Sequence, residues 1–152
     1  MSGTFSEQQL AERVVDAMMA ADAFSRWLDI KILAVGPRQA TVAMRVRDEM
    51  VNGFGVSHGG IVYSLADSAL AFASNTHGRV TVSIENSITY PHPVKVGDEL
   101  VAVAEEESAS NRLGYFRVTV KRSDGAIVAL FRGTVYKTKT DFFSRDRQGE
   151  AT

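Results

Sequence analysis

A single carboxylate, Asp67, lies inside the most apolar stretch of the chain, VSHGGIVYSLADSALAFAS at residues 56–74. Removing an ionised carboxylate from water is costly unless partners stabilise it, so its place beside Leu65 needs an explanation. The structural explanation is that Asp67 faces solvent or hydrogen-bonds Ser64 or Ser68. The chemical explanation is that the carboxylate lies in a cleft, where burial and backbone dipoles tune it as a general base or nucleophile. Spacing alone leaves both open.

Two glycines, Gly59 and Gly60, open this stretch directly after His58. Glycine at a helix start lets a ligand approach the backbone closely, and the N–H groups of the first turn have no partners within the helix. Such groups can bind the oxyanion that forms during acyl transfer, although a tight connection between loop and helix is the structural alternative. His58 is interpreted as a loop or capping residue. No second His or carboxylate stands at ligand spacing from it, so no metal site is expected.

The separation of Gly59 and Asp67 has a geometric consequence. Eight residues of helix rise by roughly 12 Å, or about two turns, which is too far for both residues to contact one carbonyl group from the same chain. If two copies of the helix run antiparallel about a two-fold axis, Asp67 of one copy comes opposite Gly59 of the other, and two sites form at once. The sequence therefore predicts a homodimer at minimum.

Hydrophobic periodicity predicts the elements that position these residues. Ser6 and Gln9 form a capping box for a helix that ends at about Ala23. The long apolar helix runs from residue 57 or 58 to Asn75 and closes at Gly78. Strands are predicted at 28–35, 40–46, 80–90, 98–107, 113–123 and 126–137, with a loop at 47–57.

The connections between these strands are short, and the strand at 80–90 alternates apolar and polar residues with a period of two. Short connections imply antiparallel neighbours, and a helix that is apolar almost all round must be covered by other elements. The predicted fold class is therefore α+β, with a curved antiparallel sheet wrapped around one long central helix.

Composition indicates one domain, spanning residues 1–140, with a polar and mobile tail at 141–152. The chain has 152 residues with 45% hydrophobic content, and its 17 Lys and Arg nearly balance 18 Asp and Glu, so no electrostatic preference for nucleic acid or anionic membrane is expected. The absence of cysteine excludes disulfides, thiolate metal sites and cysteine nucleophiles. The polar N-terminus and the lack of a long apolar run predict a cytoplasmic protein that does not insert into membranes.

The segment NGFGVSHGGIVYSLADSALAFASNTHG at residues 52–78, followed by a strand and a proline-containing turn that leads to VGDEL, resembles the hotdog-fold acyl-CoA thioesterases. The similarity spans roughly residues 40–138 and is strongest to the PaaI-type phenylacetyl-CoA or hydroxyphenylacetyl-CoA thioesterases. The resemblance implies the sheet-around-helix fold, a dimer of hotdogs that commonly pairs into a homotetramer, a role in phenylacetate degradation, and hydrolysis of an aryl-acetyl-CoA or medium-chain acyl-CoA.

The resemblance also implies roles for individual residues. Asp67 would act as general base on water or attack the thioester itself, and Gly59 would offer its N–H to the thioester carbonyl across the dimer interface. Asn52 would help to place the water or the carboxylate, and His58 would support the loop geometry. A Ser or Thr on the strand after the helix assists in some relatives, and Ser83 is the nearest match, with Thr81 and Ser87 beside it.

The acyl-CoA substrate is expected to contact Gly60 and, along the interface, Phe54, Ile61, Tyr63 or Leu65. The stretch YPHPVKVGD departs from the Arg-Pro pair of many PaaI-like chains, which leaves the contacts to the coenzyme A phosphates open. The candidates for those contacts are Arg112, Lys121, Arg122, Lys137 and Lys139, each of which could equally be an ordinary surface residue. Neither a metal nor an organic cofactor is required, because a positioned carboxylate, a water and a fixed N–H suffice for thioester hydrolysis.

Two other functions compete with the enzyme. A non-catalytic acyl-CoA-binding hotdog protein, acting as sensor or scaffold, would lack the carboxylate or carry a DNA-binding segment, but this chain has Asp67 and only about 25 residues before its first strand. A hotdog hydratase would need a closely spaced Asp and His in the helix region. The sequence favours the thioesterase.

Overall fold

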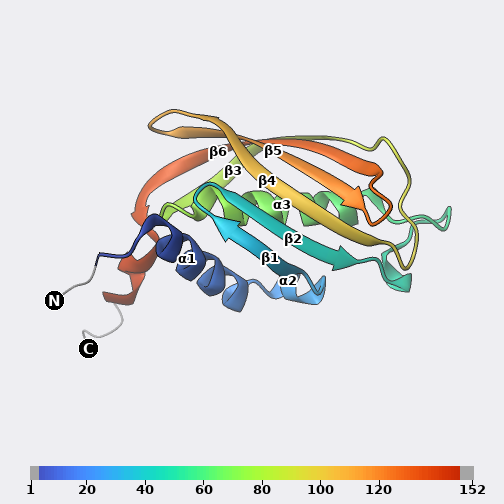
Figure 1. Cartoon of the computed structure of the whole chain (residues 1–152), viewed down its shortest axis with the longest axis horizontal. Coiled ribbons are helices and arrows are strands. Elements are labelled where there is room, and N and C mark those ends of the chain that lie inside the picture. Colours follow the sequence, from blue (N-terminus) through green and yellow to red (C-terminus); the bar gives the residue numbers. More distant parts are fainter. Residues whose placement is uncertain (1–3, 148–152) are drawn as a thin grey trace.

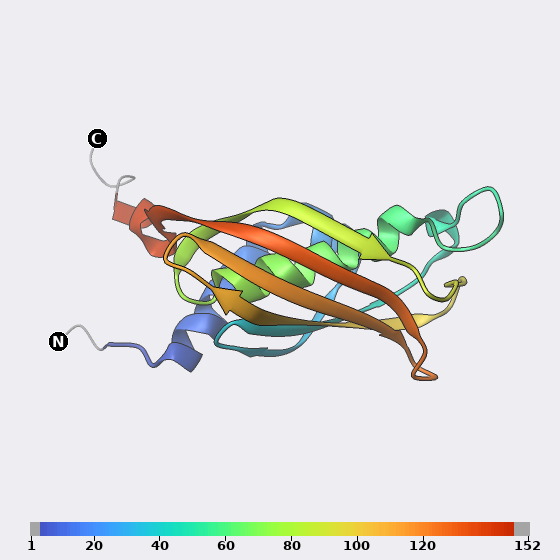
Figure 2. The same cartoon turned by 90° about the horizontal axis from the view of Figure 1, so that it is seen from above.

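Six strands form one antiparallel sheet that curves around the long central helix (Figure 1). The computed structural model describes residues 4–147. The strand order across the sheet is β1-β2-β4-β5-β6-β3, and every neighbouring pair is antiparallel. The loop before the central helix lies at one end of the molecule, and the short C-terminal helix lies at the other (Figure 2). The predicted α+β class and sheet-around-helix architecture are confirmed.

The elements follow one another in the predicted order, with three short additions. Their bounds are α1 Glu7–Ala21, α2 Ala23–Trp27, β1 Lys31–Gly36, β2 Gln39–Arg45, the 3-10 helix η1 Asp48–Met50, α3 Gly59–Asn75, β3 Arg79–Thr89, β4 Glu99–Ala109, β5 Leu113–Arg122, β6 Ile127–Asp141 and the 3-10 helix η2 Phe142–Arg147.

The central helix α3 supplies much of the core. Leu65, Leu70 and Phe72 are at most 1% exposed and pack in one cluster with the inner face of the sheet, including Phe116 and Phe131. Burying such a side chain contributes about 1.5–3 kcal/mol relative to leaving it exposed. The helix ends as predicted, since Gly78 adopts a φ of +83° that a side chain would disfavour.

The helix approaches β6 closely at Gly133. A Cβ atom at this position would lie 2.5 Å from the side chain of Leu70 and 2.8 Å from Oδ1 of Asn86. Only glycine allows α3, β3 and β6 to come together at this distance, because real Cβ atoms essentially never show contacts this short. Gly133 therefore sets how near the polar residues of β3 lie to the helix.

Strand β3 contains a bulge at Ile84 that breaks the simple alternation predicted for residues 80–90. Ser83 pairs with Val135, and Glu85 pairs with the next residue of β6, Thr134, so Ile84 is the extra residue. A bulge shifts the alternation of side chains by one position. As a result Ser83 and Asn86, three residues apart, both point toward α3, where an unbroken strand would place them on opposite faces.

The outer edge of β3 has no strand beside it in the part of the chain that the structure describes. Val82 and Ile84 on this strand are 47% and 57% exposed. Long edge strands with exposed apolar residues are templates for pairing with another chain. The edge of β3 is thus suited to continue the sheet into a second protomer.

Three of the boundaries that differ from the sequence prediction are the start of β1, the end of the first helix and the end of β6. β1 begins at Lys31, three residues after the predicted start, because Leu28 caps the short helix α2. The first helix ends at Ala21, two residues early, because Asp22 caps a separate short helix, its Oδ1 accepting from the N–H of Ser25 at 2.9 Å. The capping box of Ser6 and Gln9 is confirmed. β6 continues to Asp141, four residues past the predicted end, since it pairs with the start of β3 at Arg79.

The predicted tail at 141–152 is described only in part. Residues 142–147 form η2, and the N–H of Phe142 donates to the carbonyl oxygen of Gly78 at 2.7 Å. The rest of the predicted tail, residues 148–152, lies outside the described residues, and its mobility remains a prediction. Within residues 4–147, none of the helices is both long and apolar enough to cross a membrane.

Candidate active site

Three residues of α3 share one face of the helix: Gly59, Tyr63 and Asp67. They are spaced by four residues, so they lie one above the other along the axis. Asn86 of β3 contacts two of them, because its Nδ2 donates to the hydroxyl of Tyr63 at 2.9 Å and to Oδ1 of Asp67 at 3.1 Å. This face of α3 is therefore turned toward β3, next to the free edge of the sheet.

Asp67 is half-buried and has a specific partner. The structural explanation offered hydrogen bonds to Ser64 or Ser68 as one of its two alternatives, and neither bond is formed among the described residues. Ser64 instead donates to the carbonyl oxygen of Gly60 at 2.7 Å, and the hydroxyl of Ser68 lies 2.9 Å from that of Ser25. That part of the structural explanation is wrong, and the carboxylate faces the side chain of Asn86.

Burial raises the pKa of Asp67 above its ordinary value of 3.8, and the hydrogen bond from Asn86 offsets part of this rise because it stabilises the ionised form. A carboxylate is a more effective general base when its pKa moves toward the operating pH while the group stays ionised. Asp67 meets both conditions, because burial raises its pKa while the hydrogen bond from Asn86 stabilises the ionised form.

The start of α3 presents a backbone N–H that no described residue accepts from. The N–H of Gly60 donates to Nδ1 of His58 at 2.9 Å, so His58 caps the helix, in agreement with its interpretation as a capping residue. The N–H of Gly59 has no hydrogen-bond partner among residues 4–147. Its carbonyl oxygen accepts from the hydroxyl of Tyr90 at 2.8 Å. Of the two glycines, Gly59 thus carries the N–H available to an oxyanion, and Gly60 does not.

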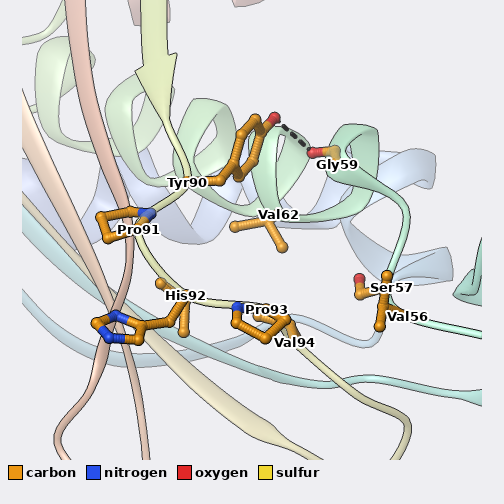
Figure 3. Close-up of a pocket in the computed structure, with 10 residues that line it drawn as sticks. Val56, Ser57, Gly59, Val62, Tyr90, Pro91, His92, Pro93 and Val94 are labelled. Atoms are coloured by element: carbon orange, nitrogen blue, oxygen red, sulfur yellow. Dashed lines mark hydrogen bonds between the residues drawn. The ribbon is translucent and has the colours of Figure 1, made fainter.

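A cavity of about 290 Å³ opens beside Gly59 (Figure 3). Its walls are mostly apolar and come from the loop before α3, from α3 itself, from the segment after β3 and from β6. The lining residues are Val56, Ser57, Gly59, Val62, Tyr90, Pro91, His92, Pro93, Val94 and Val128. Apolar concave sites with few polar groups are typical of ligand pockets. An apolar group held here would lie next to Gly59.

Asn52 organises the loop before α3. Its Oδ1 accepts from the N–H of Phe54 at 2.9 Å and of Val56 at 3.4 Å, and its carbonyl oxygen accepts from the N–H of Gly55 at 3.1 Å. These bonds form a tight Asn turn that fixes the path of the chain into His58 and Gly59. No hydrogen bond joins Asn52 to Asp67 within the described chain. The tight turn leaves the side chain of Phe54 93% exposed.

Ser83 reaches the site through Asn86. The hydroxyl of Ser83 donates to Oδ1 of Asn86 at 2.8 Å, and the other end of this carboxamide contacts Asp67. Asn86 was not among the site residues predicted from the sequence. The available signal was its place in the series Val82, Ile84, Asn86, where a carboxamide interrupts a run of apolar residues.

The other residues expected to contact the substrate lie in different parts of the molecule and do not form one site. Leu65 is 0% exposed in the core, so the prediction that it lines an acyl site is wrong. Tyr63 is half-buried, and its hydroxyl accepts a hydrogen bond from the same Asn86 amide that donates to Asp67. Arg112 lies in the turn between β4 and β5, where its carbonyl oxygen accepts from the N–H of Lys137.

Two more of the basic candidates have partners of their own. Arg122 forms an ion pair with Asp124 at 2.9 Å and donates to the carbonyl oxygen of Pro93. Lys137 donates from Nζ to the carbonyl oxygen of Ser110 at 3.1 Å. Neither is therefore an uncommitted cation at the site. No group of three or more His, Asp or Glu side chains within residues 4–147 is arranged to hold a metal ion.

The chain is similar in sequence to known thioesterases. The family model "Thioesterase superfamily" matches residues 54–129. The acyl-coenzyme A thioesterase PaaI of Escherichia coli is 34% identical over 121 residues, which cover 80% of this chain and 86% of that protein. The human acyl-coenzyme A thioesterase 13 is 30% identical over 133 residues, which cover 85% of this chain and 95% of that protein.

Solved structures agree with the sequence comparison. The structure of the E. coli PaaI protein from the phenylacetic acid degradation operon superposes with a TM-score of 0.87, at 32% identity, and covers 90% of this chain and 99% of that one. A variant of the phenylacetic acid degradation protein PaaI from Thermus thermophilus gives a TM-score of 0.74 at 40% identity, covering 77% and 100%. The chain belongs to the thioesterase superfamily, as a hotdog-fold protein of the PaaI type.

Proposed function

We propose that the protein is an acyl-CoA thioesterase that hydrolyses its substrate to a free acid and coenzyme A, with Asp67 as general base or nucleophile and Gly59 as oxyanion donor. The observation that carries the proposal is the pairing of a half-buried carboxylate of raised pKa with an unpartnered N–H on the same face of α3. The names of the E. coli and human relatives, both acyl-coenzyme A thioesterases, support the choice of substrate.

The site is completed by a second copy of the chain. Tyr63 lies midway between Gly59 and Asp67 on α3, so a two-fold axis that passes beside Tyr63 brings Asp67 of one protomer opposite Gly59 of its partner. The free edge of β3 runs next to this face and can pair with the same edge of the partner, as the exposed Val82 and Ile84 suggest. The expected assembly is a homodimer at minimum.

In the general-base form, Asp67 removes a proton from a water molecule as that water attacks the thioester carbonyl carbon. The carbonyl oxygen becomes an oxyanion and accepts a hydrogen bond from the N–H of Gly59 of the partner. Collapse of the tetrahedral intermediate breaks the carbon–sulfur bond, and the coenzyme A thiolate takes the proton held by Asp67. In the nucleophile form the carboxylate itself attacks the thioester carbonyl, and the carbon–sulfur bond breaks to release the coenzyme A thiolate and leave a mixed anhydride. Water then hydrolyses the anhydride to the free acid and the Asp67 carboxylate, and the proton released neutralises the thiolate.

The cavity beside Gly59 is the proposed site of the acyl group. Its apolar lining fits an aryl-acetyl group such as phenylacetyl or hydroxyphenylacetyl, or a medium-length alkyl chain, with the carbonyl at the cavity mouth near the Gly59 N–H. The proposed role in phenylacetate degradation is supported by the similarity to the E. coli PaaI protein from the phenylacetic acid degradation operon. Among the basic residues proposed for the coenzyme A phosphates, Arg112, Lys121 and Lys139 remain candidates, because Arg122 and Lys137 are engaged elsewhere.

Thiol release from a panel of acyl-CoA substrates tests the function. The chain has no cysteine, so a thiol reagent reports coenzyme A with no background from the protein. Wild type should hydrolyse at least one arylacetyl-CoA or medium-chain acyl-CoA, and Asp67→Asn should be slower by about 10²–10⁴-fold with the fold and assembly unchanged. Binding of acyl-CoA without thiol release by wild type would instead indicate the sensor or scaffold.

Larger assembly and location also remain proposals. The outer face of the sheet carries exposed Val103, Tyr115 and Leu130, a surface on which two dimers could pair into the expected homotetramer. Light scattering of wild type and of Leu130→Lys, which adds a charge to that surface, would separate a tetramer from a dimer. The cytoplasmic location expected from the sequence remains a prediction.

A further inference from the structure

Asn86 uses its whole carboxamide within the site. Its Nδ2 donates to Oδ1 of Asp67 at 3.1 Å and to the hydroxyl of Tyr63 at 2.9 Å, and its Oδ1 accepts from the hydroxyl of Ser83 at 2.8 Å. The side chain is half-buried between β3 and α3. A polar side chain whose hydrogen bonds are all formed in a partly desolvated site is held rigidly, so it fixes the orientation of the groups that it contacts.

We propose that Asn86 is a positioning residue for Asp67: its amide holds Oδ1 of the carboxylate and leaves Oδ2 as the oxygen that reacts, while Ser83 fixes which end of the amide faces the helix. The inference rests on the proposed function and adds to it the groups that orient the base. It assigns to Ser83 an indirect role, through Asn86, in place of direct contact with the substrate.

The two oxygens of Asp67 differ in their surroundings. Oδ1 accepts the hydrogen bond from Asn86, whereas Oδ2 has no partner among the residues that the structure describes. No buried side-chain oxygen or nitrogen within residues 4–147 lacks a hydrogen bond, so Oδ2 is accessible to solvent. A general base needs one oxygen free to take the proton from water and benefits when the other is fixed. Asn86 fixes Oδ1 of Asp67 and leaves Oδ2 free.

The orientation of the amide follows from its neighbours. Oδ1 of Asn86 points to the hydroxyl of Ser83, so Nδ2 must face Asp67, where a flipped amide would bring two oxygens together. The bulge at Ile84 is what places Ser83 and Asn86 on the same side of β3. Gly133, which pairs with Asn86 across the sheet, leaves the space that the carboxamide occupies.

Few ionisable groups surround Asp67, so the hydrogen bond from Asn86 has a large share in its electrostatics. Tyr63 is the titratable group that faces the same amide from α3. On β3, Glu85 pairs with Thr134 and points to the opposite face of the sheet, and the positions of β6 that face α3 at this level are Phe131 and Gly133. Burial raises the pKa of Asp67, and Asn86 is the group that opposes the rise.

The pH dependence of kcat/KM tests the inference. Asn86→Leu keeps the approximate volume but removes the donor, so the ionised base is less stabilised and the acidic limb of the profile should move to higher pH. At a pH on that limb, kcat should fall by about tenfold, the cost of losing a hydrogen bond to a charged group, with KM changed little. Ser87→Ala, on the same strand opposite Arg132, is the matched control and should retain the wild-type profile.

Two further variants should shift the acidic limb of the pH profile by amounts that differ from the shift in Asn86→Leu. Asn86→Asp places a second carboxylate against Asp67 and should move the acidic limb further than Asn86→Leu does. Ser83→Ala frees the amide to rotate and should produce a smaller shift in the same direction. Identical acidic limbs in wild type, Asn86→Leu and Asn86→Asp would overturn the inference.

A direct titration separates this inference from the proposed function. The carboxyl carbon-13 chemical shift of Asp67, followed against pH in wild type and Asn86→Leu, reports protonation without turnover. A higher titration midpoint in Asn86→Leu supports the positioning role even if no acyl-CoA is hydrolysed, and an unchanged midpoint refutes it. Failure of wild type to release thiol from any acyl-CoA, by contrast, counts against the proposed function alone.

Discussion

Replacing Gly59 by proline removes the proposed oxyanion donor with little change to the backbone. Gly59 is the first residue of α3, a position where proline is favoured because its missing N–H would be unpaired within the helix. The preceding residue, His58, has φ −59° and ψ 134°, which is the extended conformation that a residue before proline prefers. The helix should therefore still begin at this position in Gly59→Pro.

The matched control is Gly59→Ala. A Cβ atom at this position would lie 3.2 Å from the hydroxyl oxygen of Tyr90, so both variants press on the same side chain, but alanine keeps the N–H. Loss of one oxyanion donor costs about 10²–10³-fold in kcat, or about 2.7–4 kcal/mol. Gly59→Pro should show this loss, and Gly59→Ala should retain most of the turnover in the same thiol-release assay.

Mixing variants shows whether the site is shared between protomers. Chains carrying Gly59→Pro and chains carrying Asp67→Asn are each nearly inactive alone, but a mixed dimer joins the intact Asp67 of one chain to the intact Gly59 of the other. Random assembly makes about half of the dimers mixed, each with one intact site of two, so coexpression should restore about a quarter of wild-type activity. No recovery from verified mixed dimers, or equal loss in Gly59→Ala and Gly59→Pro, would refute the reasoning.

Three other predictions concern stability and specificity. The folded-state pKa of Asp67 lies above its ordinary value of 3.8, so ionising this carboxylate opposes folding, and the free energy of unfolding should fall as pH rises through the folded-state pKa. Urea titrations should show Asp67→Asn more stable than wild type at pH 7 and equal to it below about pH 3.8. Gly133→Ala should lower that free energy by about 1–3 kcal/mol, whereas Gly53→Ala, whose Cβ would have no neighbour within 4 Å, should change it little, and equal stabilities would contradict the close packing of α3 on β6. Val56→Trp narrows the cavity beside Gly59 and should lower kcat/KM for phenylacetyl-CoA relative to acetyl-CoA by about tenfold or more, while an unchanged ratio would place the acyl group elsewhere.

The architecture was predictable because its signals are local. The capping box at Ser6, the left-handed glycine at Gly78 and the change of period after it define where helices and strands begin and end, and short connections define antiparallel neighbours. The end of β6 was not predictable in this way. Its last residues pair with Arg79, a partner more than fifty positions away, and no pattern in the polar sequence after Tyr136 signals that pairing.

The candidate site was predictable for the residues whose chemistry stands out against their surroundings. An acid in an apolar helix and a glycine pair at a helix start are conspicuous, so Asp67 and Gly59 could be selected from sequence. The distinction between Gly59 and Gly60 could not, because it depends on which N–H the ring of His58 accepts from.

Asn86 could not be placed beside Asp67 from sequence because its position depends on a bulge. A strand read with a strict period of two puts Ser83 and Asn86 on opposite faces, and then no hydrogen bond could link them. One extra residue at Ile84 reverses this and joins both to the carboxylate. Bulges are common next to active sites because they re-aim a side chain at little cost to the sheet. The bulge in β3 therefore determines the orientation of the candidate base, because it turns Asn86 toward Asp67. Gly133 of β6, opposite Asn86, leaves the space that this side chain needs.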